Sequence, residues 1–224
     1  MFNTKSNVFN RTSAESSGNE ISSNIYNLII GLVLCWGFFV NWLIVKNVPV
    51  ASLTKIHPLI FILGYFACAI FGVFLFSKSS NPLVSFLGYN FVVIPFGFII
   101  NIIVSQYAPN LVINAMVVTG MVTAIMMILG VTYPAFFEKL APVLFISLIA
   151  VIIAEIIGSF FFKMIFGITD WIVALIFCGY IGFDWSRANK IPKTIDNAVD
   201  SAAALYIDII NLFIRILSIM GRRN

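Results

Sequence analysis

Three acidic residues lie within long apolar stretches of the chain, where charged side chains are rare. Glu155 lies in LIAVIIAEIIGSFFFK, Asp184 in GYIGFDWSR and Asp208 in AALYIDIINLF. An ionised carboxylate at the centre of a membrane-spanning helix costs about 2.5–3.5 kcal/mol on insertion scales. Such a residue needs a cationic partner, water or a proton, and it therefore marks a candidate ion or proton pathway.

Asp208 lies deep within its apolar stretch, far from either end. Asn211 follows after three residues and Arg215 after seven, so both project from roughly the same helical face as Asp208. Two interpretations remain open. Asp208 either takes part in proton or ion chemistry, or it ties helices together through Asn211 or Arg215.

Asp184 ends the preceding apolar stretch, and Arg187 follows one helical turn later. An ion pair of the two at the membrane interface is one interpretation, and a functional carboxylate is the other. Gly179 and Gly182 precede Asp184 and would let a neighbouring helix or an ion approach closely.

A short polar loop separates the stretches that hold Asp184 and Asp208, so we expect two antiparallel neighbouring helices. With a rise of about 1.5 Å per residue, Asp208 should lie deeper than Asp184, and Asp200 should lie nearer to the level of Asp184. Spacing alone therefore does not pair Asp184 with Asp208.

The other ionisable residues of the apolar stretches have simpler interpretations. Glu155 is close to Lys163 and to the end of its stretch, so it is either a buried site or a carboxylate that reaches the interface. His57 opens the second apolar stretch, where we expect an interfacial anchor. Asp170 and Asp196 lie at expected helix starts, where a carboxylate stabilises the positive end of the helix dipole.

No pattern of a metal centre or an enzyme is present in the sequence. Cys35, Cys68 and Cys178 lie in apolar stretches without a CxxC or a Cys/His cluster, so we expect free thiols. The sequence holds no HExxH and no Gly-x-Ser-Gly, and the Gly-x-Gly-Asp of intramembrane aspartyl proteases precedes neither Asp184 nor Asp208. We expect neither an enzyme nor a bound cofactor.

Composition decides the fold class. The 224 residues are 61% hydrophobic and 10% charged, whereas soluble domains carry about 25% charged residues. Continuous apolar runs of about 20 residues indicate spanning helices, and they exclude a barrel of alternating strands. We expect an all-α bundle of seven transmembrane helices, with six plus a re-entrant last hairpin as the alternative. The expected spans are residues 25–45, 56–77, 83–104, 111–132, 142–160, 168–185 and 194–219.

The ends of the chain are polar. We expect residues 1–24, rich in Ser, Asn and Thr, to form a disordered tail without a cleavable signal, residues 25–219 one transmembrane domain and residues 220–224 a basic tail. The net charge of +4 is spread thinly, so nucleic acid is not an expected partner. Loop charges favour a cytoplasmic N-terminus by seven residues (Lys5, Arg11, Lys78, Lys139, Arg187, Lys190, Lys193) against five (Lys46, Lys55, Lys163, Arg222, Arg223).

The C-terminal part of the chain resembles the Bax inhibitor-1 family of multi-spanning membrane proteins. Residues 202–221, AAALYIDIINLFIRILSIMG, are similar to the family's last helix, in which Leu-Tyr-Leu-Asp precedes Asn-Leu-Phe. Residues 183–186, Phe-Asp-Trp-Ser, resemble the family's Tyr-Asp-Thr-Gln at the end of its sixth helix. The separation of 24 residues between Asp184 and Asp208 also fits the family.

The resemblance implies a function for the two aspartates. In bacterial relatives the matching pair is hydrogen-bonded and senses pH in a calcium leak pathway, which implies the same role and transient calcium contact for Asp184 and Asp208. Characterised relatives also have an arginine in the second helix that engages the pair, whereas His57 is the only basic residue in the stretch 56–77. The expected supporting residues are Asn211, Arg215, Glu155, Asp200 and Arg187.

We therefore expect a passive, pH-dependent calcium pathway in a bacterial plasma membrane, closed while the aspartates share a proton. Two alternatives stay open. The chain could be a regulator that binds other membrane proteins, such as a protease or cell-death factors. It could also be a proton-coupled transporter, for which Glu155 would be a further essential acid. The oligomeric state is left open.

Overall fold

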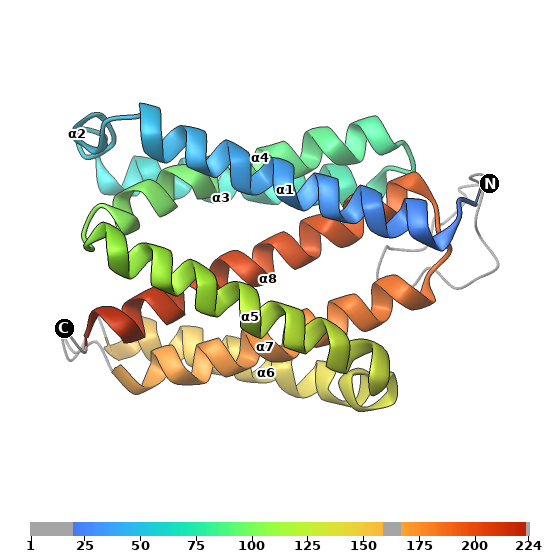
Figure 1. Ribbon diagram of the computed structural model, residues 1–224. Coiled ribbons are helices and arrows are strands. Elements are labelled where there is room, and N and C mark those ends of the chain that lie inside the picture. The colour runs from blue at the N-terminus through green and yellow to red at the C-terminus, as the bar shows by residue number, and fades with distance from the viewer. Residues whose placement is uncertain (1–19, 159–166, 223–224) are drawn as a thin grey trace. The chain divides into compact units, whose positions relative to one another are not determined.

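The computed structural model describes residues 20–158 and 167–222, and these residues form helices without a β-strand. The helices are α1 (Ser23–Asn47), α2 (Val50–Leu53), α3 (Pro58–Lys78), α4 (Pro82–Val104), α5 (Pro109–Thr132), α6 (Pro134–Ile157), α7 (Gly167–Lys190) and α8 (Ile195–Gly221) (Figure 1). Most of the expected N-terminal tail, Lys163 and the expected end of the fifth span at residue 160 lie outside the described residues.

Seven of these helices, all except the four-residue α2, are long and apolar enough to cross a membrane. The prediction of an all-α protein with seven spanning helices is confirmed, and the chain is a multi-pass integral membrane protein. Four successive spans begin with a proline in the first turn, where the missing N–H removes no helical hydrogen bond (Pro58, Pro82, Pro109, Pro134). His57 caps α3, because its Nδ1 accepts from the backbone N–H of Leu59 at 3.3 Å.

Every span differs from its expected bounds at one end or both, and α7 extends five residues past the expected end at residue 185, to Lys190. The helix α6 begins at Pro134, eight residues before the expected start at Pro142, which lies inside the helix. A proline in a spanning helix is tolerated because neighbouring groups satisfy the freed carbonyl, so Pro142 does not end it. The stretch expected to be a polar loop contains α2, and α8 extends two residues past the expected end, to Gly221.

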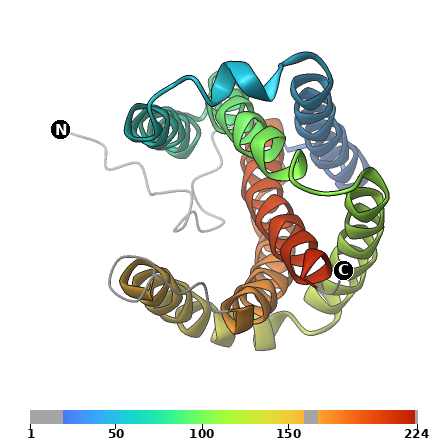
Figure 2. The same cartoon turned by 90° about the vertical axis from the view of Figure 1, so that its left-hand side faces the viewer.

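The chain divides into two compact units, and the first comprises residues 1–106 and 190–204. In this unit α4 lies between α1 and α3 (Figure 2). Gly72 of α3 and Gly88 of α4 face each other so closely that a side chain on either would meet the carbonyl oxygen of the other. On the opposite side of α4, Tyr89 donates from its hydroxyl to the Val33 carbonyl of α1 at 3.0 Å.

The first turns of α8 belong to this unit and carry buried polar groups. Ser85 of α4 donates to Oδ1 of Asp196 at 2.7 Å, so Asp196 has a tertiary partner in addition to its place at the helix start. The hydroxyls of Tyr26 and Ser201 lie 3.0 Å apart. Asp200 is also buried. These contacts attach the start of α8 to α1 and α4.

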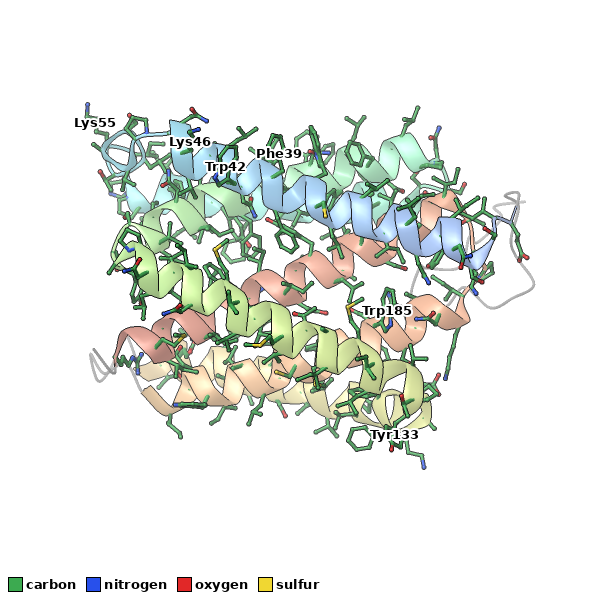
Figure 3. All side chains as sticks on the ribbon, viewed as in Figure 1. Phe39, Trp42, Lys46, Lys55, Tyr133 and Trp185 are labelled. Atoms are coloured by element: carbon green, nitrogen blue, oxygen red, sulfur yellow. The ribbon has the colours of Figure 1, made fainter. Side chains whose placement is uncertain are left out.

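The end of α1 carries an aromatic and basic group of residues. The rings of Phe39 and Trp42 stack at 5.8 Å, and the Lys46 ammonium lies 4.8 Å from the centre of the Trp42 ring (Figure 3). Trp and Lys in this arrangement are typical of the boundary between lipid and water. The connection between α1 and α3, which contains Lys55, therefore lies at a membrane surface.

The second unit comprises residues 107–189 and 205–224, and thus α5, α6, most of α7 and the remainder of α8. Glycines on α7 bring it close to its neighbours. A side chain at Gly182 would strike the ring of Phe137 on α6, and one at Gly179 would strike Leu144 of the same helix. A side chain at Gly130 of α5 would meet the carbonyl oxygen of Gly182. The close approach expected at Gly179 and Gly182 is thus helix packing.

Candidate functional site

Asp184 of α7 and Asp208 of α8 lie together in the second unit. Their carboxyl groups lie within electrostatic and hydrogen-bonding reach of each other. The Asp208 residue is 5% exposed and the Asp184 side chain 12% exposed, so little water reaches either group. Because a carboxylate has no donor, a hydrogen bond between two carboxyl groups requires a proton on one of them.

The surroundings of the two acids are poor in compensating groups. Oδ2 of Asp208 is buried and, among the described residues, has no hydrogen-bond partner. The nearest cation is Arg187, whose Nη1 lies 3.6 Å from Oδ1 of Asp184, at the long end of an ion pair. The phenol of Tyr180 lies within electrostatic reach of both carboxyl groups. Among the described residues, one cation lies near the two acids, so its charge can balance only one of the two carboxylates.

Two of the expected supporting residues have other partners. Asn211 donates from Nδ2 to the Ile207 carbonyl of its own helix at 2.8 Å. Arg215 contacts Glu155 and Asp170. Asn211 and Arg215 do lie on the same face of α8 as Asp208. The side chain of Arg215 is long, however, so its guanidinium can contact residues that are one or more turns away from Asp208. The interpretation in which Arg215 or Asn211 ties Asp208 to other helices is not supported by these contacts.

Arg215 holds two acids at once. Its Nη1 donates to Oε1 of Glu155 and to Oδ1 of Asp170, each at 2.8 Å, and its Nη2 donates to Oε2 of Glu155 at 3.0 Å. Oδ2 of Asp170 accepts from the Ser218 hydroxyl at 2.7 Å and pairs with Nη2 of Arg222 at 2.8 Å. We name these five residues the Arg215 cluster.

The expectation that the helix dipole explains Asp170 was incomplete, because Asp170 is a buried centre of this cluster. A signal was present in the sequence. Consecutive antiparallel helices place the start of one beside the end of the next, so Asp170 at the start of α7 comes to lie beside Arg215 and Arg222 near the end of α8. The carboxylate of Glu155 faces Arg215, and Lys163 lies outside the described residues.

Asp200 and Arg187 complete the expected set. Asp200 belongs to the first unit, with Asp196, and its supporting role stays a prediction. Arg187 lies next to Asp184 as its spacing predicted. The described part of the chain contains no group of three His, Cys, Asp or Glu residues that could hold a resident metal ion.

Comparisons with known proteins place the sequence among membrane proteins. It is 32% identical over 135 residues to an uncharacterized membrane protein of Streptococcus pyogenes, a match that covers 57% of this chain and 59% of the relative. It is 40% identical over 89 residues to a BI1-like protein of Arabidopsis thaliana, covering 38% of this chain and 33% of the relative. An uncharacterized membrane protein of Vibrio cholerae is 32% identical over 117 residues, with 52% of each chain covered.

The match to a family is broader than any of these pairwise matches. The profile of the family described as inhibitor of apoptosis-promoting Bax1 matches residues 18–224, which include all seven spanning helices and both aspartates. The resemblance in residues 183–186 and 202–221 therefore extends through the membrane domain, and the chain belongs to the Bax inhibitor-1 family.

Proposed function

We propose that the protein is a pH-dependent calcium leak channel whose gate is the pair Asp184 and Asp208. The observation that carries the proposal is the close approach of two carboxyl groups that are shielded from water, one on each of two consecutive spanning helices. Acids inside a membrane domain are costly and mark ion or proton pathways. A calcium ion is the permeant species here and not a resident cofactor.

The gate follows from the chemistry of a carboxyl pair. Two carboxylates in contact in a medium of low dielectric repel each other, so they share one proton and titrate as a coupled pair. The shared proton holds α7 to α8. When it leaves, two negative charges face each other, and a divalent cation relieves the repulsion because calcium readily binds carboxylate oxygens. The pathway is thus closed in the protonated pair and opens as the pH rises.

In this mechanism Arg187 is the cation that engages the aspartate pair. In relatives, an arginine of the second helix is expected to have that role. In the described residues of α3 the only cationic side chain is Lys78, in the last turn. Arg187 is itself a residue of α7, one turn after Asp184. Its guanidinium also lies 5.9 Å from the centre of the Phe183 ring. Here the counter-charge is carried by the helix that holds one of the two acids.

The test is calcium influx into liposomes that contain the purified protein and a calcium dye, from about pH 5 to about pH 8. Wild type should pass calcium faster as the pH rises. Asp184→Asn and Asp208→Asn should each flatten that dependence, because an amide leaves only one titrating acid. Glu138→Gln, the same chemical change at an exposed residue of α6, serves as the matched control and should keep the wild-type profile.

Two outcomes would contradict the proposal. Wild-type influx equal to that of empty liposomes at every pH would contradict a channel function. It would favour the alternative in which the protein regulates other membrane proteins by binding them. Unchanged pH dependence in both asparagine variants would remove the aspartates from the gate. The transporter alternative is not favoured, because Glu155 is charge-compensated by Arg215 and is not a further free acid.

A further inference from the structure

The second half of α6 is attached to its unit by few contacts. The buried side chains of α6 are Phe137 and Leu144, and none of the residues from Phe145 to Ile157 is fully buried. Many of them are exposed apolar residues that face lipid, such as Ile146 and Ile152. Packing against α7 therefore holds the first half of α6. The second half has few buried apolar contacts that would hold it in place.

Glu155 supplies the polar contact of that second half. Both of its carboxylate oxygens accept from Arg215, so the contact is the bidentate pairing that fixes position as well as charge. The same Arg215 nitrogen that donates to Glu155 also donates to Asp170, and one guanidinium thus joins α6, α7 and α8. The cluster contains two carboxylates and two guanidinium groups, so its charges compensate within the membrane domain.

Arg222 and Ser218 keep Asp170 compensated without Arg215. Asp170 accepts from both of these residues through Oδ2, on the far side of its carboxylate from Arg215. In the described part of the chain, Glu155 pairs with Arg215 alone. Loss of the Arg215 guanidinium would therefore release Glu155, and with it α6, while α7 and α8 stay joined through Asp170.

We propose that Arg215 is an ionic latch that holds the second half of α6 against α7 and α8, and that the latch restrains the calcium pathway independently of the aspartate pair. The restraint on calcium rests on the proposed function, whereas the mechanical role does not. The two devices lie at different heights of α8. Arg215 is seven residues from Asp208, which is about 10 Å along the helix.

The mechanical role is tested by a distance measurement. Two spin labels are attached at Ile152→Cys on α6 and Leu175→Cys on α7, both exposed positions, in a protein whose Cys35, Cys68 and Cys178 are replaced by serine. With Arg215 present, we expect one narrow distance distribution. Arg215→Gln should broaden it or shift it to longer distances, because the neutral amide cannot compensate Glu155.

Two further variants keep this test decisive. Asn211→Ala removes a polar side chain one turn away on α8 that bonds only within its own helix, so it should leave the distribution narrow. If Arg215→Gln does not fold, Glu155→Gln replaces it, because that change weakens only the α6 end of the latch and leaves Arg215 with Asp170. An unchanged distribution in the folded latch variant would overturn the proposal.

The effect on calcium is measured in the liposome assay. Arg215→Gln should raise influx by about tenfold at every pH, which corresponds to about 1.4 kcal/mol. Its dependence on pH should remain, because Asp184 and Asp208 are intact. If the distance distribution broadens in Arg215→Gln but neither wild type nor any variant passes calcium, the mechanical role of Arg215 is supported and the channel function is rejected. A broadened distance with influx equal to wild type would reject the restraint on calcium.

Discussion

The two acids Asp170 and Asp184 of α7 differ in how completely their charges are compensated. Asp170 is paired with Arg215, Ser218 and Arg222, so both of its carboxylate oxygens have partners. Asp184 has one distant cation and another acid beside it. The number of donors around each carboxyl group therefore separates a structural acid from a titrating one. The sequence alone does not give that number, because the donors come from other helices.

The weak ion pair of Arg187 yields a prediction at this scale. Removing its charge makes the second negative charge of the aspartate pair harder to form, so the pair should keep its shared proton to higher pH. In Arg187→Gln the midpoint of the influx profile should move upward by about one pH unit. Lys190→Gln, which removes an exposed cation three residues further along α7, should leave the midpoint in place.

The direction of that shift is the informative result. A midpoint that moves downward, or that does not move while total influx falls, would mean that Arg187 supports the fold of α7 and does not face the titrating pair. A rise that Lys190→Gln reproduces would mean that the shift does not require the contact between Arg187 and Asp184.

Helices were easier to predict than their partners. Apolar runs of about 20 residues gave all seven spans, because no other structure satisfies backbone polar groups in lipid. The start of α6 was predicted wrongly because the sequence does not distinguish a proline inside a spanning helix from one at its start. Pro142 lies inside α6, which begins at Pro134. Arg215 was one candidate partner of Asp208 because only neighbours on one helix are visible in a sequence, whereas its partners lie on α6 and α7.

Close helix packing leads to a prediction about glycines of α5. Replacing a helical glycine by alanine stabilises a helix by roughly 0.5–1 kcal/mol when space is available. Gly120 has no atom within 4 Å of the position of an added Cβ, so Gly120→Ala should leave or raise the melting temperature. Gly130 faces the carbonyl oxygen of Gly182 on α7. Gly130→Ala should therefore lower the melting temperature, because a backbone group cannot rotate away as a side chain can.

The two glycines are matched, since they lie on the same helix and undergo the same change. Thermal unfolding of both variants in one detergent, followed by the loss of monodisperse protein, measures the difference directly. Equal melting temperatures would show that α5 and α7 are not packed as closely as the structure has them.

The molecule as a whole crosses the membrane an odd number of times. The last helix, α8, has 27 residues and is about 40 Å long, more than the hydrocarbon core of about 30 Å. This length favours a full span over the re-entrant alternative, even though its first turns carry Asp196 and Asp200. Asp196 is accommodated there because it accepts a hydrogen bond from Ser85 of α4.

Five spans lie between Lys55 and Lys190, so these two exposed lysines should lie on opposite sides of the membrane. Loop charges favour a cytoplasmic N-terminus, which places Lys190 inside and Lys55 outside. In a protein with its three native cysteines replaced, Lys55→Cys should react with a membrane-impermeant maleimide on intact spheroplasts, and Lys190→Cys only after permeabilisation. The reverse pattern would invert the orientation and retain the helix count. Reaction of both on intact spheroplasts would contradict the count itself, because five crossings cannot return the chain to the side from which it started.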